Sequence, residues 1–300
     1  MNRFGIIWAL GSLVWGSLPV QAEEASVVAP GARLEKLADG FEFTEGPAAD
    51  AEGNVFFTDQ PNDRIVKWSV TGSVTDFLKP CGRSNGLCFD AAGTLWACAD
   101  EKNELWTITP TGQHEVVVRD YQGKLCNGPN DLWIRADGGL FFSDPFYKRG
   151  YWNRGPMEQD GQCVYYLAPD RKTLRRIAAD LQQPNGIIGT PDGKLLYVAD
   201  IGAKKTFAFD VNADGSLANQ RLFCEMGSDG MTIDNEGHVY LTGNGVTVFN
   251  SQGQQVHHIP VPERWTANVC FGGRDRHLLF ITASKGIYGI QMRTCGVGSQ

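Results

Sequence analysis

Residues 190–200 read TPDGKLLYVAD, a polar Asp-Gly turn followed by an apolar run that ends in Asp200. This order is typical of a β-hairpin, because Asp and Gly favour the tight turn and the apolar run fits a buried strand. Related segments occur at five other places: DAEGNVFFTD (50–59), DAAGTLWACAD (90–100), RADGGLFFSD (135–144), DNEGHVYLTG (234–243) and GGRDRHLLFIT (272–282). The chain is therefore predicted to repeat one strand-rich unit six times.

The spacing of these units indicates an all-β fold, a six-bladed β-propeller. The turn glycines at 53, 93, 138, 193 and 237 are separated by 40, 45, 55 and 44 residues. Each turn is flanked by short strands, which predicts four antiparallel strands per blade. The sixth unit has no outer strand, whereas residues 32–40 precede the first unit without a blade of their own. We expect this N-terminal strand to close the last blade, because closure leaves no strand edge unpaired.

The first 22 residues, MNRFGIIWALGSLVWGSLPVQA, have the pattern of a secretory signal. A positive charge at Arg3 precedes an uncharged apolar run, and Pro19 precedes the small Ala22. This pattern predicts cleavage after Ala22, export to the periplasm or the outside, and a single propeller domain over 23–300. The alternative is an uncleaved anchor helix, because residues 4–22 are uncharged and long enough to cross a bilayer.

The net charge and the cysteine content argue against several classes of binding partner. The formal net charge is −7, which argues against nucleic acid and, once the signal is removed, against an anionic membrane surface. We expect a small-molecule partner. All eight cysteines follow the signal, without a C-x-x-C pair, so we expect buried thiols or one or two disulfides rather than a cysteine-bound zinc ion.

A ring of polar residues is predicted at the propeller axis. The strand before each turn begins with a similar segment, such as TEGPAAD (44–50), PNGIIGT (184–190) and SDGMTID (228–234). The innermost strands of a propeller surround its channel, so equivalent positions should converge on one axis. The second residues of the six segments are Glu45, Asn85, Asn130, Asn185, Asp229 and Asn268.

Carboxylate and amide oxygens without His or Cys are typical of a site for a hard cation. Ca²⁺ takes six to eight such oxygens and tolerates irregular geometry, which favours it over Mg²⁺ or Mn²⁺. Glu45 and Asp229 would balance its charge. Zn²⁺, Mn²⁺ and Mg²⁺ stay open as the bound ion. In the alternative interpretation, these polar residues only form turns where strands begin.

Several motifs closely resemble the SMP-30/gluconolactonase/luciferin-regenerating-enzyme family of six-bladed calcium propellers. The resemblance covers most of 32–292 and rests on the motifs EGP (45–47), GRSNGL (82–87), NGPNDL (127–132), FFSDPFY (141–147), QPNGI (183–187), DGM (229–231) and NVCFGG (268–273). It implies hydrolysis of a sugar lactone of the gluconolactone type, or of an ester. Many relatives have NSPND where this chain has Gly128.

The resemblance also implies roles for ring residues. Glu45, Asn185 and Asp229 would bind the catalytic metal, Asn130 would bind metal or substrate, and Asn85 and Asp131 would stand beside them. Substrate contacts are expected from Asn85, Asn130 and Asn268.

A carboxylate near the metal would activate the water for lactone opening. Family resemblance and placement favour Asp229, whereas Asp131 is favoured because a metal-bound carboxylate is a weak base; both alternatives stay open. The loop 144–161 is predicted to be a lid, with Tyr147 and Trp152 as sugar contacts. The competing function is a non-enzymatic propeller in which calcium is structural and one face binds a protein or glycan.

Overall fold

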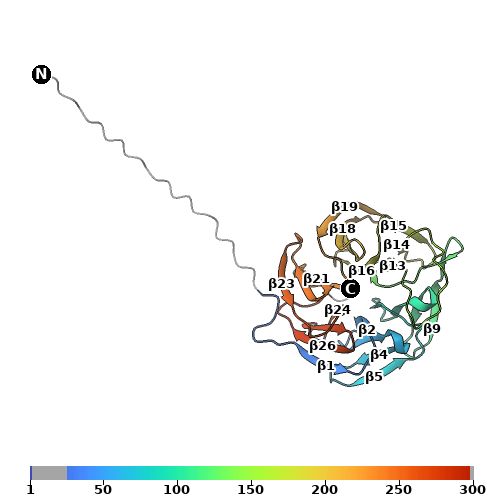
Figure 1. Ribbon diagram of the computed structural model, residues 1–300, viewed down its shortest axis with the longest axis horizontal. Coiled ribbons are helices and arrows are strands. Elements are labelled where there is room, and N and C mark those ends of the chain that lie inside the picture. Colours follow the sequence, from blue (N-terminus) through green and yellow to red (C-terminus); the bar gives the residue numbers. More distant parts are fainter. Residues whose placement is uncertain (2–25, 298–300) are drawn as a thin grey trace.

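The computed structural model describes Met1 and residues 26–297, so the predicted signal lies outside the described part except for Met1. Six four-stranded antiparallel sheets are arranged around a central axis (Figure 1). The innermost strands of adjacent sheets contact one another all the way around the ring. The predicted six-bladed β-propeller is confirmed.

The first three blades follow one another along the chain, each running from its inner to its outer strand. Blade 1 consists of β2 (Thr44–Ala49), β3 (Val55–Asp59), β4 (Arg64–Trp68) and β5 (Val74–Leu78). Blade 2 consists of β6 (Leu87–Phe89), β7 (Leu95–Ala99), β8 (Glu104–Ile108) and β9 (His114–Val118). Blade 3 consists of β12 (Leu132–Ile134), β13 (Leu140–Asp144), β14 (Cys163–Leu167) and β15 (Leu174–Ala178).

The remaining blades repeat this order. Blade 4 consists of β16 (Pro184–Gly189), β17 (Leu195–Asp200), β18 (Lys205–Val211) and β19 (Leu217–Cys224). Blade 5 consists of β20 (Met231–Ile233), β21 (Val239–Gly243), β22 (Gly245–Phe249) and β23 (Gln255–Ile259). Blade 6 consists of β24 (Thr266–Gly272), β25 (Leu278–Ala283), β26 (Gly286–Gln291) and the N-terminal β1 (Glu35–Asp39). The short elements are the hairpin β10 (Asp120–Tyr121) and β11 (Lys124–Leu125), and the 3-10 turns η1 (Gln60–Asn62) and η2 (Asp100–Lys102).

The ring closes as the sequence predicts. Strand β1 pairs antiparallel with β26, with Glu35 opposite Gly289 and Asp39 opposite Gly286. The first and last parts of the propeller thus share one sheet, and the innermost strands β2 and β24 are neighbours. Closure of this kind leaves blade 6 with the same four strands as the others.

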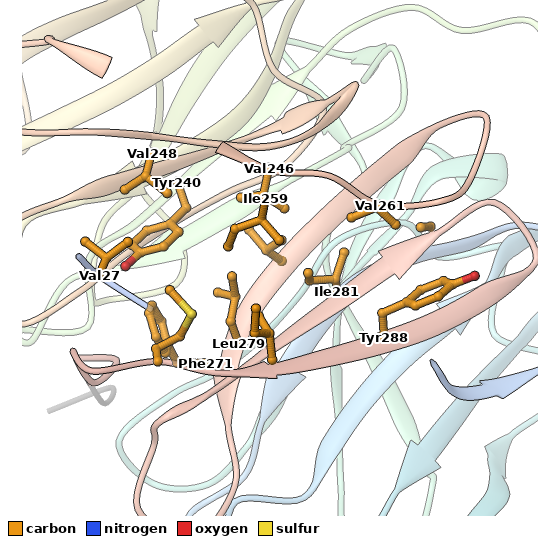
Figure 2. Packing of buried hydrophobic residues seen from close by; sticks show 14 residues of the cluster. Val27, Tyr240, Val246, Val248, Ile259, Val261, Phe271, Leu279, Ile281 and Tyr288 are labelled. Carbon is orange, nitrogen blue, oxygen red and sulfur yellow. The ribbon is translucent and has the colours of Figure 1, made fainter. Parts of the chain in front are cut away.

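The apolar core lies between the blades. Figure 2 shows the interface of blades 5 and 6, where Tyr240, Val246 and Ile259 face Leu279 and Ile281. All five side chains are buried. Burying a side chain of this size stabilises the fold by about 1.5–3 kcal/mol, and similar clusters fill the other interfaces. The packing fixes neighbouring inner strands, and therefore the residues at their starts.

All eight cysteines are free thiols, either buried or partly buried. The expectation of buried thiols is confirmed, and none of them forms a disulfide. Among the described residues, no helix is both long and apolar enough to span a membrane.

Candidate active site

Five of the six predicted ring residues gather where the innermost strands begin. Glu45, Asn85, Asn130 and Asn185 are all at most 2% exposed, whereas Asp229 is only partly buried. The Asn185 amide Nδ2 donates a hydrogen bond of 2.8 Å to Asp229 Oδ1. Asp229 is therefore the ring residue that an approaching small molecule meets first.

A repeated carboxylate positions the ring residues. Asp200, at the end of β17, accepts hydrogen bonds from the backbone N–H groups of Gln182 and Gln183 at 2.7 and 2.9 Å. These residues are three and two positions before Asn185, so Asp200 orders the chain just before the ring. Asp59 in blade 1 and Asp144 in blade 3 make the same bonds to residues three and two before Glu45 and Asn130. These bonds explain the Asp that ends three of the six repeated segments.

The residue after the ring position must be small in most blades. A Cβ on Gly46 would lie 2.1 Å from the Asn85 backbone oxygen, and one on Gly230 would lie 1.9 Å from Asn268 Cγ. Real Cβ atoms do not approach other atoms so closely, so glycine allows neighbouring inner strands to come together. Two blades have a side chain at this position instead.

The predicted register of blade 6 is wrong by one residue. The backbone N–H of Asn268 donates to Thr282 Oγ1 at 3.1 Å, as Asp131 N–H donates to Ser143 Oγ in blade 3 at the same distance. Asn268 thus corresponds to Asp131, and the ring position of blade 6 is occupied by the buried Ala267. The register of β24 is irregular between residues 266 and 268, and a one-residue shift turns a side chain toward the other side.

Asp131 and Asn268 form a floor beneath the ring. Both residues line a cavity of about 130 Å³ whose walls are formed by residues of the inner strands. Gly296 and Val297 near the C-terminus also line this cavity. Asp131 therefore lies on the cavity side of the ring. We call the other end of the channel, where Asp229 is partly exposed, the mouth.

Burial of the carboxylates raises their pKa values. The pKa of Glu45 is well above its ordinary value because of burial and the nearby negative charge of Asp229. Burial also raises the pKa of Asp229 and brings that of Asp131 to about 8. Desolvation and like charge both disfavour the ionised form of a carboxyl group. Ionised Glu45 and Asp229 therefore repel each other, and a bound cation would relieve this repulsion.

The donor atoms fit a cation with oxygen ligands. Glu45 Oε1 and Asn185 Oδ1 are buried and make no hydrogen bond within the described residues. The amide nitrogens of Asn85 and Asn130 are also buried and unpartnered there, and rotation of each amide would present its oxygen instead. In residues 26–297, no three His, Cys, Asp or Glu side chains cluster to hold a metal ion, so a cation here needs the amide oxygens. Such a mixed set suits Ca²⁺.

The loop 144–161 lies across the mouth and is held by three blades. Tyr151 OH donates to Gln60 Oε1 of blade 1 at 2.8 Å, and Arg154 forms a buried ion pair of 2.7 Å with Asp100 of blade 2. Tyr147 OH accepts a hydrogen bond of 2.9 Å from Asn185 of blade 4. The loop predicted as a lid thus contacts a ring residue directly.

The departure at Gly128 is explained by this lid. A Cβ at Gly128 would lie 2.6 Å from Arg154 Nη1 and 2.2 Å from Asp100 Oδ1, so serine would not fit beside the ion pair. Trp152, one of the predicted sugar contacts, is 8% exposed and packs near Arg154 and Tyr151. Its Nε1 is buried without a partner in the described part of the chain.

Two residues at the mouth are missing from the sequence prediction. Trp265 Nε1 donates a hydrogen bond of 2.6 Å to Asp229 Oδ2. Arg149 carries a positive charge that acts on both Glu45 and Asp229. The sequence held only weak signals for them: a Trp just before the sixth inner strand, and the basic residues of the inserted loop.

Removing the Asp200 carboxylate should destabilise the segment just before the ring residue Asn185, although Asp200 is not itself a ring residue. We expect Asp200→Ala to lower the free energy of unfolding by about 2–3 kcal/mol, because the backbone N–H groups of Gln182, Gln183 and Ala203 lose a charged acceptor. The matched control is Asp210→Ala, which removes an exposed pair with Arg221 and should cost at most about 1 kcal/mol. Urea unfolding of both variants measures this difference; equal effects would contradict the positioning role.

The comparisons with known proteins agree on one family. The family model described as "SMP-30/Gluconolactonase/LRE-like region" matches residues 43–285. A gluconolactonase of Zymomonas mobilis is 29% identical over 88% of this chain and 82% of its own length. The solved structure of a gluconolactonase of Xanthomonas campestris is 31% identical, with a TM-score of 0.84 over 89% of this chain and 91% of that one. A lactonase of Staphylococcus aureus is 25% identical over 80% of this chain and 76% of its length.

Proposed function

Because this chain belongs to the SMP-30/gluconolactonase/LRE-like family, we propose that it is a metal-dependent lactonase that opens a sugar lactone of the gluconolactone type. The observation that carries the proposal is the ring of Glu45, Asn130, Asn185 and Asp229 beneath a lid, in which Glu45 Oε1 and Asn185 Oδ1 are buried without a partner in the described residues. The similarity to a gluconolactonase and to other lactonases supports this reaction class.

We propose Ca²⁺ as the bound ion, held by Glu45, Asn130, Asn185 and Asp229. The support is the set of hard oxygen donors and the strained pair of carboxylates. A bound divalent cation would polarise the lactone carbonyl and stabilise the departing alkoxide.

Asp229 is the proposed base. Its side chain is partly exposed, whereas Asp131 is 7% exposed and lies in the floor. Trp265 and Asn185 each donate to one oxygen of Asp229, which fixes the carboxylate plane while leaving lone pairs for a water molecule. Asp229 would take the water proton as the water attacks the carbonyl carbon.

Tyr147 is placed to orient the substrate. Its hydroxyl oxygen already accepts a hydrogen bond from Asn185, so its O–H is left to donate to a substrate oxygen at the ring. Burial raises the pKa of Tyr147, which keeps this donor protonated. Asn85 and Trp152 are further proposed contacts.

A substrate panel tests the proposed function. Purified protein is assayed on sugar lactones, aryl esters and organophosphates, with Ca²⁺ or with EDTA. We expect the highest kcat/KM on a sugar lactone, and loss of that activity with EDTA. A calcium-loaded protein that is inactive on the whole panel would favour the non-enzymatic binding propeller.

Trp152 provides a separate prediction about binding. Trp152→Ala should raise KM about tenfold and change kcat little, because a lid contact contributes substrate binding rather than chemistry. Steady-state kinetics on the best lactone measures both values. A large fall in kcat with constant KM would show that Trp152 acts on the reacting atoms instead.

We also propose that the protein is exported and that residues 1–22 are removed. The supporting feature is the charged start, apolar run and small-residue end of this segment. N-terminal sequencing of the exported protein should begin at Glu23. Recovery of intact Met1 in the membrane fraction would instead support the anchor helix.

A further inference from the structure

Arg149 is a residue of the lid, and its positive charge acts on the carboxylates of the candidate metal ring. It is partly buried, and its guanidinium carbon lies 4.7 Å from the centroid of the Tyr147 ring. Tyr147 is itself hydrogen-bonded to Asn185. The positive charge lowers the pKa values of Glu45 and Asp229, so Arg149 lies close to the mouth.

Two other arginines at the mouth, Arg83 and Arg154, already have hydrogen-bond or ion-pair partners. Arg154 is paired with Asp100, and Arg83 donates to the backbone oxygens of Gln60 and Pro61. Arg149 differs because, within residues 26–297, no atom of its guanidinium forms an ion pair or a hydrogen bond, and its Nε is buried. A partly buried arginine with unmet donors is suited to receive an anionic ligand.

Charge balance at the mouth leads to the same conclusion, provided that the proposed function is right. A divalent cation would neutralise the two charges of Glu45 and Asp229. Asp100 is neutralised by Arg154 at 2.7 Å. The positive charge of Arg149 then has no protein counter-charge among these groups, and a low-dielectric site makes that charge costly until a ligand supplies one.

We propose that the substrate is a lactone that carries a carboxylate or phosphate on its ring substituent, and that Arg149 binds this anionic group. The lactone carbonyl would lie at Asp229 and the ring, and the anionic substituent would point toward the lid. The planar guanidinium can make two parallel hydrogen bonds to either anion. Arg149 is thus a specificity-determining residue at the other end of the substrate.

Binding and turnover are measured together to test this. The wild type and Arg149→Met are compared on D-gluconolactone, D-glucarolactone and 6-phosphogluconolactone. Binding of the open-chain acids gluconate, glucarate and 6-phosphogluconate is measured by calorimetry at fixed Ca²⁺. We expect Arg149→Met to lower kcat/KM and product affinity about 10- to 100-fold more for an acidic compound than for the neutral one. Chelation of calcium by these acids is the same for both proteins and cancels in the comparison.

Two control variants distinguish specific binding of the anionic group by Arg149 from the effect of removing any positive charge from the lid. Lys148→Met removes a charge from the exposed neighbouring position and should leave the preference for acidic compounds unaltered. Arg149→Lys keeps the charge but loses the two-pronged donor, so it should recover only part of the preference. The acid that shows the larger loss in Arg149→Met identifies carboxylate or phosphate as the natural group.

The possible failures are distinct. Hydrolysis of the neutral lactone with no effect of Arg149→Met on the preference for acids would overturn the role of Arg149 and leave the lactonase intact. Absence of hydrolysis on all three lactones would count against the proposed function, while calorimetry would still decide whether Arg149 binds acidic sugars. Equal losses for acidic and neutral compounds would show that Arg149 only supports the lid.

Discussion

Replacing Asp229 by Asn is expected to lower kcat on the best lactone by about 10³- to 10⁵-fold, even at saturating Ca²⁺. General-base catalysis contributes about 10²–10⁴-fold, and weaker metal ligation adds to the loss because Lewis-acid assistance is worth several kcal/mol. The amide keeps the size of the side chain and can still accept a hydrogen bond from Trp265. Single-turnover kinetics, with bound metal measured in the same samples, separates the two contributions.

The matched variant for this experiment is Asp131→Asn. Asp131 accepts from the Leu132 backbone N–H at 3.0 Å and lines the same floor cavity as Asn268. We expect the variant to keep fold and metal and to retain kcat within about tenfold, because its oxygen does not face the mouth. If Asp131→Asn loses turnover by decades while Asp229→Asn does not, Asp131 is the base and the assignment made here is wrong.

The second large effect is expected from Glu45→Gln. Glu45 is 1% exposed, and its Oε1 has no partner within the described residues. Loss of one of two ring carboxylates should weaken Ca²⁺ binding at least about 100-fold, more than the loss from Asn185→Ala. Calcium at 100 times the wild-type Kd stabilises the wild type by about 2.7 kcal/mol and would then stabilise the variant by only about 0.4 kcal/mol.

The Tm of the metal-free protein provides a second test of this prediction. Burial and the charge of Asp229 raise the pKa of Glu45, so replacement by neutral Gln relieves repulsion in the metal-free protein. We expect the Tm of metal-free Glu45→Gln to equal or exceed that of the wild type. Glu115→Gln, at an exposed position on β9, is the charge-matched control. A Ca²⁺-induced stabilisation as large as that of the wild type would rule Glu45 out as a ligand.

The repeating parts of the molecule could be predicted from the sequence. Five of the six blades have a polar ring residue, and every repeat has a turn that contains Asp and Gly, so these five ring residues and the closing strand were accessible to alignment of the repeats. The prediction for blade 6 was wrong because its ring position is occupied by the apolar Ala267. The polar Asn268 next to it was therefore matched to the ring residues, although it corresponds to Asp131.

The mouth could be predicted only in outline. The inserted loop was identifiable by its length and aromatic content, but its path depends on contacts with other blades. The pairing of Arg154 with Asp100 joins residues far apart in the chain, as does that of Trp265 with Asp229. Local propensity does not encode such pairs, so Arg149 and Trp265 emerged only from the three-dimensional arrangement.

Stepwise return of calcium to metal-stripped protein tests whether lactone hydrolysis requires one bound ion. The wild type is treated with EDTA, freed of chelator and titrated with Ca²⁺ while bound metal and lactone hydrolysis are measured in the same samples. We predict that hydrolysis is lost on stripping and returns in proportion to one bound ion per chain, and that Glu45→Gln needs much more calcium for the same recovery. Full hydrolysis by the metal-free protein, or one tightly bound ion without hydrolysis, would show that the protein is not a calcium-dependent lactonase.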